Sequence, residues 1–274
     1  AIQYADYADW QREWMSGDVL AQQQAYWRKQ LQDVPQLHSL PLDYKRPVNQ
    51  TFRGKMFKQT LPSSTVAALQ ALCQVHDVTL FMLMETAFAL LLSRYSNEQD
   101  IVVGSAVAGR GHQDLEGLIG FFINSVALRT DLSGNPTFVE LLERNKQVVL
   151  DAYAHQDVPF DMLVEELRPE RNLSYNPIFQ IMFAVERHEV AEPSSVQAPL
   201  LRSIEDYYAA NSTTRSDLQV QVNLVGEQAS VSWIYNESLF ANSSIENMAE
   251  SYSTLLASIV ASETDSPASV PGAQ

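Results

Sequence analysis

Aromatic residues recur every three or four positions along the first fifteen residues of the chain. A helix would place these residues on one face: Tyr4, Tyr7, Trp10 and Trp14. Gly17 interrupts the pattern, and a second helical period follows it as far as Leu31. The pattern predicts two short helices. An aromatic face at this spacing is typical of a buried core or of a contact between domains.

Apolar residues at helical spacing predict five further helices. Thr137 and Glu140 have the spacing of a capping box, and Thr79 is a candidate cap for the most apolar of these segments. Serines are the expected caps of two others: Ser63 or Ser64 for one, and Ser243 or Ser244 for the last. The predicted helices run from Ser63 or Ser64 to about Val75, from Leu80 to Tyr95, from Thr137 to about Tyr153, from Pro159 to Leu167, and from Ser243 or Ser244 to about Val260.

Short runs rich in branched apolar residues predict six strands. The predicted strands span residues 52–61, 100–104, 119–128, 177–184, 217–224 and 228–235. The last two alternate apolar and polar residues around Val225-Gly226-Glu227, as the strands of a hairpin do. Helices and strands are mixed without strict alternation, so the pattern predicts an α/β fold, here an α+β sandwich with a mixed sheet flanked by helices.

Polar segments and segments rich in proline or glycine predict the connections. Residues 33–50 have the character of an extended connection, residues 108–117 of a polar loop, and residues 186–216 of a long irregular excursion. Residues 262–274 are rich in Ser, Pro and Ala, which is typical of a linker toward a following domain. The folded unit is therefore expected to span residues 1–261.

The chain is acidic, with 18 Lys and Arg against 33 Asp and Glu and a net charge of −15 over 274 residues. This balance argues against partners such as nucleic acid or an anionic membrane, because both need a basic face. The single cysteine, Cys73, excludes an internal disulfide and a zinc site built from cysteines. With no secretory signal and no apolar run of membrane-spanning length, we expect a cytoplasmic location. The start at Ala1 suggests a fragment of a longer chain.

Two His-Gln-Asp triplets are the candidate acid–base pairs of the sequence. His112 and Asp114 lie in a glycine-rich polar loop, where a solvated side chain is the alternative. His155 would end one helix and Asp157 would cap the next, which is a structural role. The histidines have no metal-ligand spacing, and we find no phosphate loop, dinucleotide fingerprint or nucleophile elbow. Composition and pattern alone therefore name no reaction.

Four segments, in this order, resemble the motifs of one enzyme family. They are Tyr4-Ala5-Asp6-Tyr7-Ala8-Asp9-Trp10-Gln11, Ile119-Gly120-Phe121-Phe122-Ile123-Asn124-Ser125, His155-Gln156-Asp157-Val158-Pro159-Phe160-Asp161 and Arg171-Asn172-Leu173-Ser174-Tyr175-Asn176-Pro177-Ile178-Phe179. Asp217-Leu218 and residues 235–240 resemble smaller landmarks of the same family. On these motifs the chain resembles the condensation domains of nonribosomal peptide synthetases.

The resemblance implies a fold of two lobes, each like chloramphenicol acetyltransferase, with the active site in a tunnel between them. The family's catalytic motif, His-His-x-x-x-Asp-Gly, belongs to the first lobe and does not occur in this sequence. The chain therefore resembles the second, acceptor-side lobe, and we expect it to be inactive alone. The intact domain would join a donor acyl or peptidyl thioester to an acceptor aminoacyl thioester. Both substrates would be carried on phosphopantetheine arms, so no directly bound cofactor is expected.

The resemblance also suggests which residues face the tunnel. Asn176 is the leading candidate because its amide could bind a substrate carbonyl or the arm, although Asn before Pro is also a common turn former. The other tunnel candidates are Ser174, Tyr175, Asn124, Ser125, Gly104 and Ser105. The remaining motif residues are expected to be structural: Tyr7, Trp10, Arg110, His155, Asp157, Pro159, Phe160 and Asp217. For residues 121–123, packing in the core is the alternative to a role in the tunnel.

The expected partners follow from the same resemblance. They are the N-terminal lobe of the same domain, the upstream and downstream peptidyl carrier domains, and the adjacent adenylation domain. Residues 108–124 resemble the loop that closes the tunnel floor, and residues 186–216 the segment that crosses to the first lobe. Without that lobe, an exposed apolar face would favour self-association.

Two other functions remain open. The chain could be a docking or scaffold module for carrier or adenylation domains, or half of an epimerisation domain. A standalone acyltransferase fits the carrier-linked motifs poorly. Residues 118–122 and 170–175 resemble condensation domains that follow an epimerising step or are dual epimerising ones, which hints at a donor of D configuration.

Overall fold

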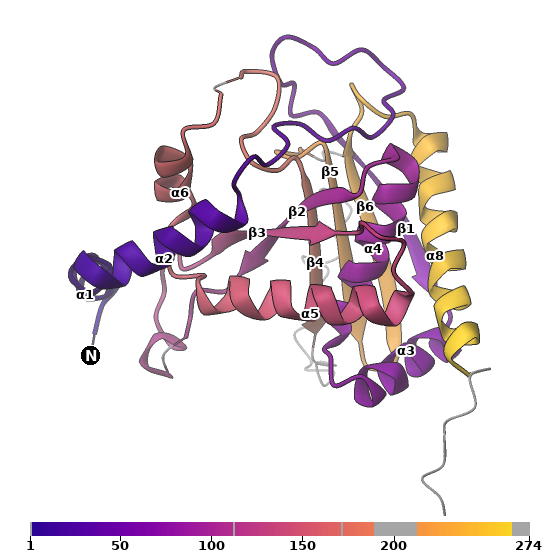
Figure 1. Cartoon of the computed structure of the whole chain (residues 1–274), viewed down its shortest axis with the longest axis horizontal. Coiled ribbons are helices and arrows are strands. Elements are labelled where there is room, and N and C mark those ends of the chain that lie inside the picture. Colours follow the sequence, from indigo (N-terminus) through magenta and orange to yellow (C-terminus); the bar gives the residue numbers. More distant parts are fainter. Residues whose placement is uncertain (1, 112, 171, 189–212, 265–274) are drawn as a thin grey trace, which may run out of the picture.

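The computed structural model describes residues 2–111, 113–170, 172–188 and 213–264 of the chain (Figure 1). Its centre is a six-stranded sheet with the order β1-β6-β5-β4-β2-β3. The strands are β1 (Gly54–Leu61), β2 (Asp100–Val107), β3 (Asn124–Asp131), β4 (Ile181–His188), β5 (Leu218–Val225) and β6 (Gln228–Asn236). β4 pairs in parallel with β5 and with β2, and the other pairs are antiparallel. The predicted mixed sheet and α+β fold are confirmed.

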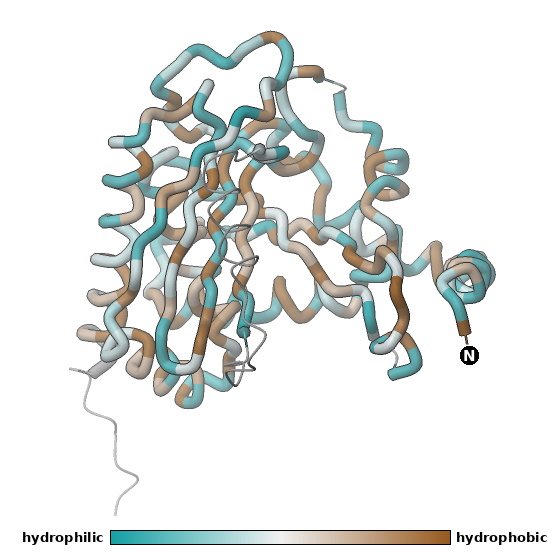
Figure 2. Tube along the Cα trace, turned by 180° about the vertical axis from the view of Figure 1, so that it is seen from behind, coloured by the Kyte–Doolittle hydropathy of each residue, from teal (hydrophilic) through white to brown (hydrophobic). Residues whose placement is uncertain are grey.

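Four helices pack together against one face of this sheet (Figure 1). They are α3 (Ser63–Val75), α4 (Leu80–Ser96), α5 (Phe138–Ala154) and α8 (Asn242–Thr264). Figure 2, seen from behind, shows the strands of the other face with no described helix over them. The other described α-helices, α1 (Tyr4–Trp14), α2 (Gly17–Gln30) and α6 (Phe160–Leu167), lie toward the β3 edge. No single described helix is long and apolar enough to cross a membrane; α3 and α4 reach that limit only as a pair bent by 106°.

α4 supplies the centre of the core because it is apolar almost all round. Phe88 stacks on Phe183 of β4 with ring centroids 5.2 Å apart, and Trp233 and Tyr252 meet Phe88 edge-on at 6.1 Å. The Tyr252 hydroxyl donates a hydrogen bond of 2.8 Å to the Met84 carbonyl. Large buried rings dominate the energetics of a core, so this cluster joins the helices to the sheet.

The sheet is most weakly joined between β2 and β4. β2 pairs with β3 along its whole length but meets β4 at a single bridge, Gly104 to Met182. The ring of Phe179, just before β4, lies so close to Gly104 that a Cβ there would overlap it. The glycine therefore lets Phe179 fill the space where the two strands diverge.

Three predicted strand boundaries differ from the structure by four residues or more. The strand predicted at 119–128 begins only at Asn124, because the residues before it form an exposed loop. The strand predicted at 177–184 begins at Ile181, because Ile178 has a φ of 69° and this interrupts extended backbone. That strand continues to His188, so the first residues predicted for the excursion 186–216 belong to β4, and residues 189–212 lie outside the described part of the chain.

The helix caps are partly as predicted. Thr79 accepts a hydrogen bond from the backbone N–H of Met82, and Thr137 forms the predicted capping box with Glu140. The predicted serine cap of α3 is wrong, because Pro62 occupies the cap position and no side chain caps the helix.

α8 begins before the predicted serine cap and continues to Thr264, so the predicted linker 262–274 starts inside the helix. Its first turn is bound by Asp43, from the connection before β1. The Asp43 carboxylate accepts hydrogen bonds of 2.8 Å from the Ala241 N–H and 2.7 Å from the Ser244 hydroxyl. This long-range partner explains why a local cap was the wrong prediction. The rest of the tail lies beyond the described residues.

Candidate functional site

Residues from four separate parts of the chain line a groove of about 420 Å³ beside the start of β3. Its walls come from α1, from the loop between β2 and β3, from the segment that leads into α6, and from Arg215 before β5. Six residues that the sequence singled out line it: Tyr7, Asn124, Ser125, Asp157, Pro159 and Phe160. Three motifs that are far apart in the sequence therefore meet at one place.

α1 is held against the loop before β3 by its two tyrosines. The Tyr4 hydroxyl donates a hydrogen bond of 2.8 Å to the Phe121 carbonyl. The Tyr4 ring covers Gly120 so closely that a Cβ at this position would overlap it. The Tyr7 ring packs on Phe122, with centroids 4.9 Å apart. The glycine of the second motif thus fits the aromatic face of the first.

Phe122 is the anchor of this loop. It is buried between α1 and Arg110, whose guanidinium carbon lies 4.1 Å from the ring centre. Arg110 also donates to the Leu115 carbonyl and so shapes the loop. Three neighbouring apolar side chains point outward instead: Ile119 (96% exposed), Phe121 (75%) and Ile123 (58%). Core packing therefore accounts for Phe122 but is the wrong interpretation for the apolar residues on either side of it.

Asn124 holds the segment that leads into α6. Its Nδ2 donates to the carbonyls of Gln156 and Val158, each at 2.7 Å, and its Oδ1 accepts from the Phe160 N–H at 3.0 Å. The Asn124 side chain therefore caps α6 from a neighbouring strand. Asp157 makes no capping hydrogen bond, so the predicted local cap is wrong.

His155 and Asp157 do not form an acid–base pair. The His155 Nδ1–H donates to the Asp151 carbonyl at 2.7 Å, and its ring stacks on Tyr26 with centroids 4.0 Å apart. Asp157 lies at the exposed rim of the groove, where partial burial of the carboxyl raises its pKa. Burial also raises the pKa of Tyr7, with smaller contributions from Tyr4 and from the Asp157 charge. A carboxyl group and a phenol with raised pKa values thus both line the groove.

The motif that contains Asn176 forms a turn before β4, residues 174–179, which we call the Asn176 turn. Asn176 does not itself line the groove, but its Nδ2 donates to the carbonyl of Arg215, which does. Gln50 donates to the same carbonyl at 2.9 Å. Arg215 therefore connects the Asn176 turn to the groove.

The Asn176 turn has an unusual backbone. The Phe179 N–H donates to the Pro177 carbonyl at 2.9 Å, which closes a three-residue turn around Ile178 at φ 69°. A turn of this hand is rare, and a β-branched residue in it costs about 1–3 kcal/mol. Such a conformation persists only where the surrounding structure holds it.

Asp217, at the start of β5, is buried and bound by two side chains. Arg46 donates to both carboxylate oxygens, at 2.6 and 3.1 Å, and His38 Nε2 lies 2.9 Å from one of them. Burial alone would raise the pKa of Asp217, but the hydrogen bonds from His38 and Arg46 outweigh it and hold the pKa below its ordinary value. Because the Leu40 N–H donates to His38 Nδ1, the proton of the neutral imidazole lies on Nε2 and points to Asp217.

Arg46 connects this ion pair to the Asn176 turn. It donates to the Ser174 carbonyl at 3.3 Å, and its guanidinium carbon lies 5.9 Å from the centre of the Tyr175 ring. Sequence patterns assign no role to Arg46 or His38, since their segment has the character of a connection. The three prolines of that segment fix φ at three positions, and this stiffness was the available signal that the segment is held in place.

The remaining candidates lie away from the groove. Ser105 is buried inside β2, and Gly104 lies under Phe179. Trp10 stacks on Trp14, with centroids 5.3 Å apart, on an exposed part of α1. α1 buries none of its residues, so the core interpretation of its aromatic face is wrong. Contact with another domain stays the prediction for this face.

A family model described as Condensation domain matches residues 1–270. One of the linear gramicidin synthase proteins of Brevibacillus parabrevis is 45% identical over 260 residues, which are 94% of this chain and 3% of that protein. The X-domain in its complex with OxyB from teicoplanin biosynthesis has a TM-score of 0.81 at 26% identity, covering 95% of this chain and 58% of that one. Holo-AB3403, a four-domain nonribosomal peptide synthetase bound to AMP and glycine, has a TM-score of 0.79 at 26% identity, covering 90% and 20%.

These similarities agree with the mixed sheet of the chain and with the groove at which three ordered motifs converge. The chain spans only a few per cent of the curated relative's length. The similarity nevertheless extends over nearly all of the chain itself. The chain belongs to the condensation domain family of nonribosomal peptide synthetases.

Proposed function

We propose that this chain is the acceptor-side half of a condensation domain, which joins two thioesters carried on phosphopantetheine arms. The neutral amine of the acceptor aminoacyl thioester would attack the carbonyl carbon of the donor thioester. The amide C–N bond forms, the C–S bond breaks, and the donor arm leaves as a thiol that takes up the proton lost by the amine. Upstream and downstream carrier domains, and an adjacent adenylation domain, would be the partners.

The convergence of three family motifs on one groove carries this proposal. Tyr7, Asn124 and Phe160 each come from a different motif and line the same groove. The described lining of that groove includes no histidine, and the sequence contains no adjacent pair of histidines. This supports a division of work in which this half binds and aligns the acceptor while a first lobe supplies the acid–base group. The exposed side chains of Ile119 and Phe121, beside the groove, would meet that lobe.

Alignment is a large part of what such a reaction needs. Two tethered reactants held in attacking geometry gain effective molarities of about 10⁵ M or more. Asn176 suits this role, because its Nδ2 is bound to the Arg215 carbonyl whereas its Oδ1 accepts no hydrogen bond from the described residues. An amide N–H of the acceptor arm would be a fitting donor to this oxygen.

A binding module without its own chemistry is the second candidate. The specific observation in its favour is the similarity to the teicoplanin X-domain, which was solved in complex with OxyB. In that case the exposed indoles of Trp10 and Trp14 would form part of a surface for another protein.

Reconstitution distinguishes these functions. The chain is produced together with an N-terminal lobe of the same family, supplied with loaded donor and acceptor carriers, and assayed for peptidyl product by mass spectrometry. Product that requires both halves supports the proposal. The control is a first lobe whose second motif histidine is replaced by alanine, which should give no product. A stable complex without product favours the docking module, and a donor epimerised without amide formation favours half of an epimerisation domain.

A further inference from the structure

We propose that Gln180 is a positioning residue, whose buried side chain holds the Asn176 turn so that Asn176 is presented beside the groove. The inference rests on the proposed function, in which Asn176 binds the acceptor arm. Gln180 does not line the groove, and the motif noted in the sequence ends one residue before it. Its role would therefore be exerted through Asn176.

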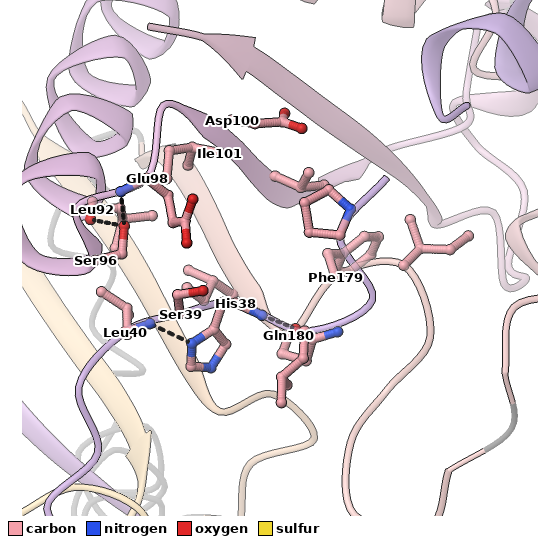
Figure 3. A pocket seen from close by; sticks show the side chains of 15 residues that line it. His38, Ser39, Leu40, Leu92, Ser96, Glu98, Asp100, Ile101, Phe179 and Gln180 are labelled. Carbon is pink, nitrogen blue, oxygen red and sulfur yellow. Dashed lines mark hydrogen bonds between the residues drawn. The ribbon is translucent and has the colours of Figure 1, made fainter. Parts of the chain in front are cut away.

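The side-chain amide of Gln180 joins three backbone groups. Its Nε2 donates to the carbonyls of Asn176 at 2.8 Å and Gln36 at 3.0 Å. Its Oε1 accepts from the His38 N–H at 3.1 Å, the hydrogen bond drawn between these two residues in Figure 3. The residue is only 3% exposed, so these hydrogen bonds are shielded from water. One amide thus ties the Asn176 turn to the extended segment that crosses it.

The backbone of Gln180 fixes the other side of the turn. Its carbonyl accepts from the Asp217 N–H at 2.8 Å, and the Asp217 carboxylate in turn binds Arg46 and His38. Arg46 reaches back to the Ser174 carbonyl at the start of the Asn176 turn. Both ends of the turn are therefore anchored to one buried ion pair.

The turn needs this support because space lies behind it. Ile178 is buried in the left-handed region at φ 69°, which a β-branched residue rarely adopts. Ile178, Phe179 and Gln180 line a cavity of about 110 Å³ together with residues that include His38 and Leu40. Figure 3 shows this cavity, with all of these residues except Ile178 labelled. Packing alone leaves room for the turn to relax toward the cavity. The hydrogen bonds of Gln180 oppose that relaxation.

An amide is the group that these three partners require. A carboxylate at this position would lose both donors and would face the two carbonyl oxygens with a negative charge. A methionine has a similar volume and no hydrogen bond to offer. Gln180→Met should therefore release the Asn176 turn without leaving a hole in the packing.

Hydrogen exchange on the chain itself tests the geometry. In Gln180→Met the Phe179 amide should exchange about tenfold faster because the turn around it loses its support, while the amides of α4 keep their protection. The His38 amide should also exchange faster, because the substitution removes its acceptor, Gln180 Oε1. The matched control is Gln59→Met, which removes an amide that donates to the Ala249 carbonyl at 3.1 Å between β1 and α8. This control should leave the Asn176 turn unchanged. Unchanged exchange of the Phe179 amide in Gln180→Met overturns the inference, whatever the His38 amide does.

Kinetics of the reconstituted two-lobe domain test the role. Asn176→Ala and Gln180→Met should each lower kcat/KM for the acceptor carrier by about tenfold, with half-saturation by the donor unchanged. The double variant should be no slower than Asn176→Ala, because Gln180 acts through Asn176. Additive losses, or equal losses for donor and acceptor, overturn the inference.

The same kinetics distinguish a failure of the proposed function of Asn176 from a failure of the positioning role of Gln180. If Asn176→Ala leaves the acceptor kinetics unchanged, the proposed function of Asn176 is overturned. If Asn176→Ala has its effect and Gln180→Met does not, only the positioning role of Gln180 is overturned. Gln59→Met serves as the control here too, since any loss it shares with Gln180→Met reports stability rather than position.

Discussion

Helices α4 and α1 have the same kind of sequence signal, apolar or aromatic side chains at helical spacing, and opposite surroundings. Ten residues of α4 are buried, whereas none of α1 is. α4 is enclosed by two strands and by α3, α5 and α8, while the aromatic face of α1 meets the loop before β3 at one end and is exposed at the other. Hydrophobic periodicity therefore predicts a helix and its face, but it does not say what covers that face.

The largest expected effect is at the centre of α4. Phe88→Ala should lower the free energy of unfolding by about 3–5 kcal/mol, because the ring contacts Phe183, Trp233 and Tyr252 and the cavity would be closed on all sides. Chemical denaturation followed by circular dichroism measures it. Phe88→Leu is the control and should cost much less. A loss below about 1 kcal/mol for Phe88→Ala would show that the core can collapse around the site.

α4 also contains the acidic residue Glu85, which no solvent reaches. Burial raises the pKa of Glu85 to about 7, although a hydrogen bond from Asn145 partly opposes the shift. The folded pKa lies above the value of 4.5 for an unperturbed glutamate, so the folded state binds the proton more tightly. The resulting stabilisation is complete below about pH 4.5 and is lost as the pH rises through 7.

We therefore expect the wild-type chain to lose roughly 2–3 kcal/mol of unfolding free energy between pH 5 and pH 8 through this group. Glu85→Gln should remove that part of the pH dependence, since the amide stays neutral at both values. The comparison is the difference between the two pH values for each protein, measured in the same denaturant series. Equal slopes in wild type and variant would show that Glu85 does not titrate in this range.

The sequence predicts most of the fold because the strongest signals are local. The capping box at Thr137, the apolar run of α4 and the β5–β6 hairpin each depend on residues that are close neighbours in the chain. The wrong predictions concern ends that distant residues determine. Asp43 binds the first turn of α8, and Asn124 caps α6, so the nearby serine and aspartate were misleading.

The site is harder to predict from the sequence than the fold, for the same reason. The motif residues Tyr7 and Phe160 were found, but two of the groups that hold the Asn176 turn come from a distant segment, and the third lies one residue beyond the motif. Arg46, His38 and Gln180 act through backbone carbonyls and N–H groups, which any residue provides and no motif records. Only the folded backbone brings them together.

The next largest effect is expected on self-association, through the exposed apolar residues beside the groove. Ile119 and Phe121 stand beside the groove with most of their surface in solvent, so we expect the isolated chain to self-associate through this face. Ile119→Ser combined with Phe121→Ser should weaken the association by about tenfold or more, as loss of a central apolar contact does. Sedimentation equilibrium measures it, with Val75→Ser on the exposed end of α3 as control. A monomeric wild-type chain at high concentration would contradict the expectation.

The smallest expected effect on stability is at Trp10 of α1. The indole is half exposed, and its ring contacts are with Tyr7 and Trp14 of the same helix. Trp10→Ala should therefore change the unfolding free energy of the isolated chain by no more than about 0.5 kcal/mol. Trp27 in the neighbouring α2 is 1% exposed and donates to the His155 carbonyl at 2.8 Å, so Trp27→Ala should cost about 3–5 kcal/mol. Affinity for the first lobe should reverse this order, because binding would bury Trp10 and leave Trp27 as it is. If Trp10→Ala destabilised the chain as much as Trp27→Ala, α1 would belong to the core after all, and the contrast with α4 would disappear.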